Sequence, residues 1–406
     1  MSSFRNIGHC EIPNDWADIS LGDEYKRPLL VMRNGLTKTQ NDHDGTFKVS
    51  RIETISNGVI DESRVKYLSE VSREEEDKYL IRKNDILFSH INSDAHLGKT
   101  AIAKKDYDDL LHGMNLLLFR VNEEILDPEF LFFTTNYYKN IGVFISIGSR
   151  AVNQSSINQG KLKALKVPLP PLPEQRNIAH ILSKIQSAIE TQEKIIQTTT
   201  ELKKALMQKL FTEGLKGEPQ KETEIGLVPK SWKVKVFENI VTLQRGKDLP
   251  KDKFVQGKFH VGGSNGIIGY HNQFNTKAPG ITVGRSGSCG KVVFYDKNFW
   301  AHNTALVVKD FHDNNEKFIY YFLCFLKLEK YKSGVSVPTL NRNAFRTIEM
   351  AIPKIDEQIE NAKTLEQTDK KITMTIEKKN VFQSLFKPML HHLMTGQIRV
   401  KDLRFS

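Results

Sequence analysis

Two short glycine-bearing stretches are the places in this 406-residue chain where phosphate chemistry could be sought. Residues 97–100 (LGKT) are similar to the end of a phosphate-binding loop, but that motif needs a glycine five residues before Gly98, where the chain has Ser93. Residues 284–290 (GRSGSCG) are rich in glycine but lack the spacing of a dinucleotide-binding fingerprint. We therefore expect both stretches to be turns that line a binding face, with Lys99 contacting a base or a phosphate.

The histidines and cysteines do not have the spacing of a metal site. His391 and His392 are adjacent, and His90 and His96 stand near one another, but neither pair has further ligands at suitable positions. The three cysteines are scattered, which predicts neither a disulfide framework nor a zinc site and fits a reducing cytoplasm. No Ser/His/Asp or Cys/His set has supporting context, and the Asn/Asp-Pro-Pro-aromatic motif of amino-methyltransferases is missing from the sequence. These observations favour a chain that is not an enzyme and binds no cofactor of its own.

The net charge of +11, with a pI near 9.2, favours a polyanionic partner. Nucleic acid is the first candidate, and a basic but otherwise ordinary surface is the alternative. The hydrophobic content of 39% and charged content of 26% are typical of a soluble globular protein. No apolar run approaches the ~18 residues of a membrane span, and the N-terminus lacks the apolar core of a signal peptide. We expect a cytoplasmic protein without a membrane partner.

The glycine-bearing stretches lie at corresponding places in two strand-rich segments. In each segment short strands are followed by an amphipathic helix, and the first helix has Asp127 as its expected N-cap. Gly98 and Lys99 correspond to Gly290 and Lys291. The expected strands are residues 47–55, 85–91, 100–103 and 115–121 in the first segment and 280–283, 291–295 and 305–308 in the second, and the expected helices are 127–141 and 315–331.

The repeat is clearest around a proline-rich stretch, residues 168–176 (PLPPLPEQR). A shift of 183 residues places Glu174 and Gln175 on Glu357 and Gln358. The chain is therefore an internal duplication. After the prolines, about 38 residues without proline or glycine predict a helix of roughly 57 Å.

Apolar residues recur along both long helices, and their early spacing of four and three predicts a coiled-coil seam. Such a narrow stripe needs a partner helix, and the second copy supplies one. The residues expected to pack between the helices are Ile178, Leu182, Ile185, Ile189, Ile196, Leu202, Leu206 and Leu210 in the first and Leu365, Ile372, Phe382, Leu385, Met389 and Leu393 in the second.

A Pro-x-x-Trp motif opens each copy, at Pro13 and Trp16 and again at Pro229 and Trp232. We expect each Trp to fill a core. The motifs are 216 residues apart, so the first globular segment is longer than the second by 33 residues. Polar residues 213–226 are expected to be a linker. The predicted divisions are residues 1–167, 168–217, 218–352 and 353–406.

In the proline-rich segment the chain resembles the specificity subunits (HsdS) of type I restriction–modification systems, and the resemblance covers its whole length. The resemblance includes the Pro-x-x-Trp motifs, two target-recognition domains and a helix after each, although the second signature has the single proline Pro353 and Pro388 interrupts the second helix. It implies an α+β fold: two similar recognition domains, with small mixed sheets and helices, separated by two long antiparallel helices in a pseudo-twofold repeat. Each domain would read one half of a split double-stranded DNA target.

The resemblance also implies partners. Two methyltransferase (HsdM) subunits would dock on the helices, which also set the spacer, and two restriction (HsdR) subunits would complete an ATP-dependent endonuclease. S-adenosylmethionine, ATP and Mg would then belong to those partners. The alternatives are a standalone DNA-binding regulator and a self-contained DNA methyltransferase or nuclease.

Candidate DNA-contacting residues follow from side-chain type and loop position, because Arg, Lys, Asn, Gln and Ser can reach base edges in the major groove. Arg33, Lys38 and Lys332 are further candidates for phosphate contacts. The candidates in the first domain are His90, Asn92, Ser93, Lys99, Arg150, Asn153 and Gln154. Those in the second domain are Arg245, Lys247, Ser264, Asn265, Arg285, Ser286, Ser288, Lys291, Ser336 and Asn341.

Overall fold

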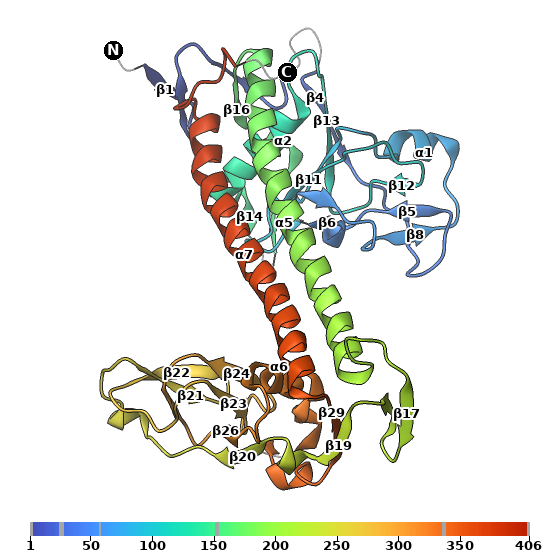
Figure 1. The fold of residues 1–406 in the computed structure, drawn as a ribbon. Helices are drawn as coiled ribbons and strands as arrows, with labels where there is room; N and C mark the ends of the chain where they lie inside the picture. Colours follow the sequence, from blue (N-terminus) through green and yellow to red (C-terminus); the bar gives the residue numbers. More distant parts are fainter. Residues whose placement is uncertain (1–2, 24–27, 57, 151–153, 335–337, 404–406) are drawn as a thin grey trace. The chain divides into compact units, whose positions relative to one another are not determined.

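The computed structural model describes residues 3–23, 28–56, 58–150, 154–334 and 338–403. The chain divides into two compact units, which we call unit 1 (residues 1–191 and 378–406) and unit 2 (residues 192–377). Each unit contains a lobe of small sheets and helices together with parts of two long helices, α5 (Leu172–Thr212) and α7 (Ile355–Met394) (Figure 1). The predicted α+β class is confirmed.

Unit 1 is built on a four-stranded antiparallel sheet with the order β11–β9–β13–β4. A smaller sheet has the order β12–β5–β8, and its β12 and β5 strands are parallel. The bounds of these strands are β4 Leu30–Asn34, β5 Phe47–Val49, β8 Lys66–Leu68, β9 Ile86–Phe88, β11 Thr100–Ile102, β12 Leu110–Leu111 and β13 Leu117–Val121.

Unit 2 repeats this topology. Its four-stranded antiparallel sheet has the order β24–β23–β26–β20, and its three-stranded sheet, β25–β21–β22, again contains one parallel pair, β21 with β25. The duplication found in the sequence is therefore a duplication of the fold. The bounds are β20 Thr242–Arg245, β21 Phe259–Gly263, β22 Gly266–His271, β23 Gly280–Gly284, β24 Val292–Tyr295, β25 Phe299–Ala301 and β26 Ala305–Asp310.

Some of the shorter elements also correspond between the units. Unit 1 adds β1 Phe4–Asn6, β2 Glu11–Pro13, β3 Ala17–Ser20, β6 Ile55–Ser56, β7 Val59–Ile60, α1 Arg73–Tyr79, β10 Ile91–Asn92, α2 Pro128–Asn140, α3 Val143–Ile147, β14 Ser149–Arg150, β15 Ser155–Ser156, α4 Gln159–Lys163 and β16 Lys166–Leu169. Unit 2 adds β17 Gln220–Thr223, β18 Gly226–Pro229, β19 Lys233–Val236, α6 Glu316–Leu326, β27 Lys332–Ser333, β28 Thr339–Leu340 and β29 Glu349–Ile352. The β1–β2 and β17–β18 hairpins correspond, as do the β16–β3 and β29–β19 pairs.

The helix that follows each sheet is capped in the same way. Asp127 accepts the N–H of Phe130 at 2.9 Å to cap α2, and Asn315 accepts the N–H of Phe318 at 2.9 Å to cap α6. The expected extension of the second helix to residue 331 is wrong. Lys327 has a φ of +48°, so α6 ends at Leu326 and only a short 3₁₀ turn follows.

The long helices run antiparallel within each unit. In unit 1 the first turns of α5, with Ile178 and Leu182, share a core with the last turns of α7, with Leu390 and Leu393. In unit 2 the last turns of α5, with Leu210, share a core with the first turns of α7, which include Leu365. Among the other expected seam residues, Ile185, Ile189, Ile196, Leu206, Ile372, Phe382 and Met389 are partly buried.

Two of the expected seam residues do not pack there. Leu202 is 60% exposed and Leu385 is 46% exposed, which corrects the prediction that they lie in the seam. A straight α-helix has 3.6 residues per turn, so a 3.5-residue stripe rotates away from its partner by about 20° per heptad. The α7 helix continues through Pro388.

The expected linker also contains regular structure, because residues 220–223 form strand β17 and pair with β18. That hairpin precedes the buried Trp232, as β1–β2 precedes the buried Trp16. The prediction that residues 213–226 are only a linker is therefore wrong for their second half. The side chains of this two-stranded hairpin lie largely at the surface, so its composition is as polar as that of a linker.

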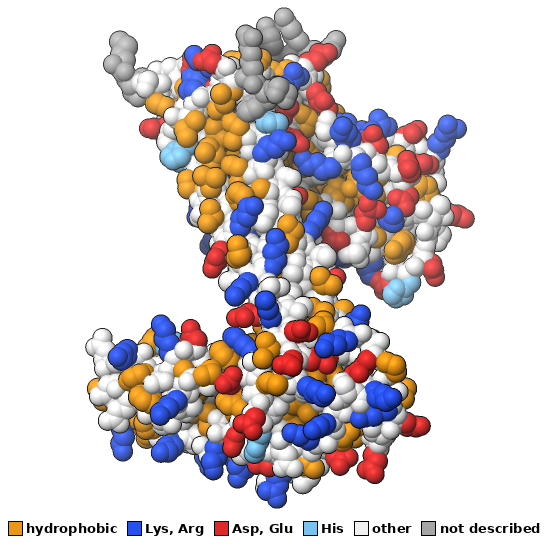
Figure 2. Space-filling model, viewed as in Figure 1, with side chains coloured by type: hydrophobic (Ala, Val, Ile, Leu, Met, Phe, Trp, Pro, Cys, Tyr) orange, Lys and Arg blue, Asp and Glu red, His pale blue; other side chains and the backbone are white. Residues whose placement is uncertain are grey.

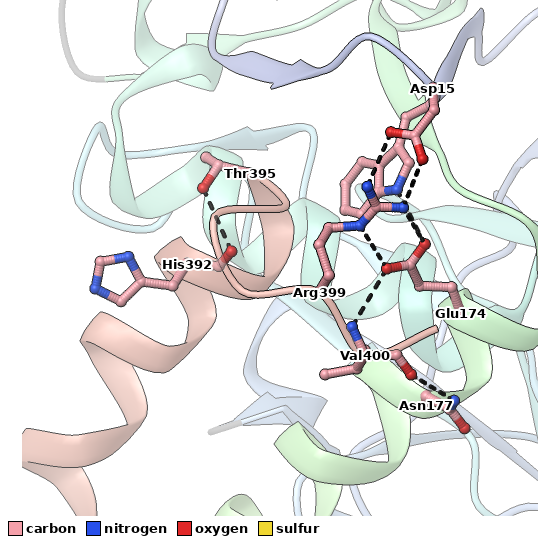
Figure 3. A network of polar contacts seen from close by, with 8 residues as sticks. Asp15, Glu174, Asn177, His392, Thr395, Arg399 and Val400 are labelled. Atoms are coloured by element: carbon pink, nitrogen blue, oxygen red, sulfur yellow. Dashed lines mark hydrogen bonds and ion pairs between the residues drawn. The ribbon is translucent and has the colours of Figure 1, made fainter. Parts of the chain in front are cut away.

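In unit 1 the C-terminal tail lies against Asp15 and Glu174 (Figure 3). Arg399 donates to both oxygens of Glu174, at 2.8 and 2.9 Å, and to both oxygens of Asp15, each at 2.9 Å. The indole N–H of Trp16 donates to Glu174 at 3.1 Å. The tail therefore ties the Pro-x-x-Trp motif to the first turn of α5.

Among the described residues, no helix is long and apolar enough to span a membrane.

Candidate nucleic-acid interface

The loop that joins β9 to β11 in unit 1 is closed by backbone hydrogen bonds. The N–H of Ser89 donates to the carbonyl of Lys99 at 2.8 Å, and the N–H of Gly98 donates to the carbonyl of Ser89 at 2.9 Å. Gly98 has a φ of +75°, and a Cβ there would lie 2.2 Å from the ring of Phe144. The base of the loop is therefore fixed, whereas residues 93–96 at its tip are exposed.

The loop that joins β23 to β24 in unit 2 closes in the same way. The N–H of Gly284 donates to the carbonyl of Lys291 at 2.7 Å, and the N–H of Gly290 donates to the carbonyl of Gly284 at 2.8 Å. Gly290 has a φ of +82°, matching Gly98. The sequence correspondence of the two loops is thus a correspondence in backbone conformation, at the equivalent edge of the four-stranded sheet in each unit.

In unit 1 the loop pairs with the β14–β15 hairpin through β10. Asn92 donates from Nδ2 to the hydroxyl of Ser89 at 3.0 Å, and Arg150 forms an ion pair with Asp94 at 3.4 Å. The pairing brings Asn92, Ser93 and Arg150 together, and the side chain of Arg150 remains largely exposed. Gln154 is also exposed, and Asn153 lies outside the described residues.

Two of the candidates in unit 1 are less accessible than the others. His90 is partly buried, its Nδ1 has no partner among the described residues, and desolvation by burial lowers the pKa of its ring. Lys99 is also partly buried. Of the proposed phosphate contacts here, Lys38 forms an ion pair with Glu75 at 2.6 Å, which offsets its charge.

Unit 2 has a cleft of about 450 Å³ that contains three arginines. Arg342 is held by donation from Nη1 to the carbonyl of Leu243 at 2.8 Å, and Arg245 donates from Nε to the carbonyl of Asn303 at 3.4 Å. Within the described ranges, the Arg285 side chain makes no hydrogen bond or ion pair, so its donors are available to a ligand. The cleft is lined by Arg245, Arg285, Leu306, Ser333, Thr339, Leu340, Asn341, Arg342 and Asn343.

Other candidates in unit 2 shape the surroundings of this cleft. Lys291 donates to the backbone carbonyl and the side-chain oxygen of Asn265, at 2.9 and 2.8 Å, and so ties two loops together. A Cβ on Gly284 would lie 2.5 Å from the carbonyl oxygen of Ser264 and 2.0 Å from that of Ser288, which shows how closely the loops approach. Ser286 is partly buried, Lys247 is exposed, and Ser336 lies outside the described residues.

Sequence reasoning found Arg245, Arg285 and Asn341 but missed Arg342 and Asn343 in the same cleft. The missed residues directly follow Asn341, so the Asn-Arg-Asn run was an available signal. Net charge alone would not have found the cleft. On the face drawn in Figure 2, lysine and arginine side chains are dispersed over each lobe and mixed with acidic ones.

The surrounding chemistry fits recognition of an anionic ligand. Arginine presents a planar set of donors that suits phosphate oxygens and the O6 and N7 atoms of guanine, and asparagine suits adenine. Among the described residues, no group of three or more His, Cys, Asp or Glu side chains could hold a metal ion.

Comparison with known proteins gives a consistent result. The family described as "Type I restriction modification DNA specificity domain" matches residues 13–201 and again residues 229–382. The chain is 35% identical over 423 residues to the MjaX type I restriction enzyme specificity subunit of Methanocaldococcus jannaschii, covering 98% of this chain and 97% of the relative. It is 23% identical to the MjaVIII specificity subunit of the same organism, over 99% and 97% of the two chains.

Solved structures show the same fold. The S subunit of a type I restriction–modification system from M. genitalium matches with a TM-score of 0.63 at 19% identity, over 93% of this chain and 96% of that one. A chain from a structural study of complex assembly and conformational transition in the type I system matches with a TM-score of 0.52 at 15% identity, over 95% and 99% of the two chains.

Proposed function

The chain belongs to the family of type I restriction–modification DNA-specificity subunits, which are non-catalytic DNA-recognition subunits, and from this premise we propose a role for each of its parts. Each unit reads one half of a bipartite double-stranded DNA target. The antiparallel helices set the distance between the half-sites and dock two HsdM methyltransferase subunits, and two HsdR restriction subunits complete the assembly in the cytoplasm.

The observation that carries the proposal is the repeated loop with different side chains. The loops after β9 and β23 have the same closure, yet the first presents Asn92 beside Arg150 of strand β14, and the second presents Arg285 beside an arginine-lined cleft. A duplicated scaffold with unlike recognition residues suits two different half-sites, as the twofold symmetry of dimeric readers suits two equal ones.

Docking on the helices is supported by the two residues that leave the seam. Leu202 and Leu385 correspond under the 183-residue shift, and both are exposed. An apolar residue exposed at the same position in both copies suits two copies of one partner, because a repeated surface binds a repeated subunit. S-adenosylmethionine, ATP and Mg would be bound by the partner subunits.

Co-expression with the methyltransferase of the same system tests the assembly, with the mass of the purified complex as the readout. Sequencing of methylated sites then tests the spacer role. Inserting four residues, about 6 Å of helix, into both α5 and α7 should lengthen the unread spacer by about two base pairs at ~3.4 Å each.

The control is the same four-residue insertion near Lys216, which lengthens the chain outside both helices. An unchanged spacer in the helix variant would refute the proposal that the helices set the distance between the half-sites. DNA binding that needs no methyltransferase, with no methylated sites, would instead favour a standalone regulator.

A further inference from the structure

In unit 1 a short hairpin packs onto the edge of the main sheet. The N–H of Ile102, in edge strand β11, donates to the carbonyl of Gly58 in the β6–β7 hairpin at 3.2 Å. A Cβ on Gly58 would lie 2.9 Å from the Phe132 ring and 3.0 Å from Nε2 of Gln186. The hairpin therefore occupies the junction of β11, α2 and α5.

The three residues that contact Gly58 have definite counterparts in unit 2. Ile102 pairs with Ile86 in its sheet as Phe294 pairs with Ile281. By the sequence correspondence, Phe132 matches Tyr320 and Gln186 matches Asp369. These counterparts are the residues that a hairpin like β6–β7 would touch in unit 2.

In unit 2 this junction is an open groove of about 570 Å³. Unit 2 has the shorter globular segment, and the described part of the chain places no hairpin against β24, which is an edge strand. An edge strand leaves a row of backbone groups available for pairing. The groove is lined by Val292, Val293, Phe294, Lys317, Tyr320, Tyr321, Glu366, Asp369, Lys370, Thr373, Met374 and Glu377.

The chemistry of the groove favours a polypeptide over DNA. Met374 is 66% exposed, and the ammonium of Lys317 lies 3.6 Å from the centroid of the Phe294 ring. Asp369 is already engaged by Lys203 at 2.5 Å and by the Tyr321 hydroxyl at 2.8 Å. The lining also has Glu366 and Glu377, so three carboxylates stand beside two lysines, Lys317 and Lys370, and the net negative charge disfavours phosphates.

We propose that this groove docks an extended segment of a methyltransferase subunit, which pairs with the edge of β24 as the β6–β7 hairpin packs on β11. The segment lays β-branched or other apolar side chains over Phe294, Tyr320 and Met374. This inference rests on the proposed function. Because the chain's own hairpin occupies the counterpart in unit 1, unit 2 alone presents this groove within the described part of the chain, and the two methyltransferase subunits bind with unequal affinity.

The test uses Met374→Glu, which places a charge on an exposed groove residue, and the matched control Thr191→Glu at the corresponding exposed position of α5. Native mass spectrometry over a range of methyltransferase concentrations measures both binding steps. For the unaltered chain we expect the first and second methyltransferase subunits to bind in two steps of different affinity. Met374→Glu should weaken the tighter step about tenfold, and Thr191→Glu should change neither step.

Hydrogen exchange provides a second readout. Amides of residues 292–295 should become protected when the methyltransferase binds, whereas β11 should be protected already in the free chain. The inference is overturned if β24 gains no protection, if both variants behave alike, or if Met374→Glu alters DNA affinity and leaves stoichiometry unchanged. If the unaltered chain binds no methyltransferase, the proposed function itself fails, and that result is distinct from failure of the groove alone.

Discussion

The side chain of Gln175 accepts the backbone N–H of Asp127 at 2.8 Å. Its amide nitrogen donates to the carbonyls of Ile125 and Pro170, at 3.1 and 2.9 Å. One buried amide therefore joins the N-cap of α2, the loop before it and the proline-rich segment that leads into α5.

Gln358 makes the corresponding contacts in unit 2. Its oxygen accepts the N–H of Asn315 at 2.9 Å, and its nitrogen donates to Asn314 at 2.8 Å and to the carbonyl of Pro353 at 3.0 Å. The Gln of each Glu-Gln signature thus joins the lobe of its unit to the start of a long helix. Glutamine suits this place because a single planar group supplies both the acceptor and the donors.

Replacing Gln175 with methionine should lower the free energy of unfolding of unit 1 by about 1–3 kcal/mol, because buried backbone groups lose their partner. Hydrogen exchange should show faster exchange at the first turn of α2. The matched control is Gln197→Met, on an exposed part of the same helix, where the amide donates to Glu201 at 3.2 Å. Equal effects of the two substitutions would contradict a specific role for Gln175.

These contacts show what the sequence could predict. The two Glu-Gln signatures marked the repeat, and Asp127 was recognised as an N-cap from its position before Pro128. Both depend on local patterns, which a sequence displays directly. The loop pair around Gly98 and Gly290 was found in the same way, by its equal place in the two copies.

Contacts between distant segments could not be predicted. Arg399 is 225 residues from Glu174, and no pattern marks it as the partner of that carboxylate. The exposure of Leu202 and Leu385 was also hidden, because a spacing of four and three does not show where a helix turns away from its partner. The hairpin at β17 lay in a polar stretch whose composition is typical of linkers.

Replacing Arg399 with alanine should weaken the attachment of the C-terminal tail to unit 1 and lower the free energy of unfolding of that unit. Glu174 is 1% exposed, and loss of its guanidinium partner would leave a buried carboxylate without its counter-charge, at a cost of about 2–5 kcal/mol. Urea unfolding and protease cleavage of the C-terminal tail measure the effect. Lys401→Ala, at an exposed neighbouring position, serves as the control and should change neither.

Unit 1 should also loosen in acid. Burial acts to raise the pKa of Glu174, but hydrogen bonds from Arg399 and Trp16 outweigh it and hold that pKa below its usual range. Because the folded pKa is the lower one, the stabilisation is present above the unfolded value of about 4.3 and is lost as pH falls through the folded value. The indole N–H resonance of Trp16 should therefore shift below about pH 4. Glu174→Gln should remove this titration, and a Trp16 signal that still titrates in the variant would point to another group.

Arg285 provides the sharpest test of half-site reading, because its side chain is free of partners among the described residues and borders the arginine cleft. Arg285→Ala should weaken binding to targets that carry the second half-site by about 1–3 kcal/mol and relax specificity at one base pair. Lys332→Ala, at an exposed residue next to the same cleft, is the comparison for a phosphate contact. It should weaken all sequences equally and reduce the salt dependence by about one ion. Both are measured on the complex with its methyltransferase, by fluorescence anisotropy with DNAs that carry both half-sites, either one, or neither. If Arg285→Ala lowered affinity for every DNA equally, Arg285 would contact only the backbone, and the cleft would position the DNA without reading it.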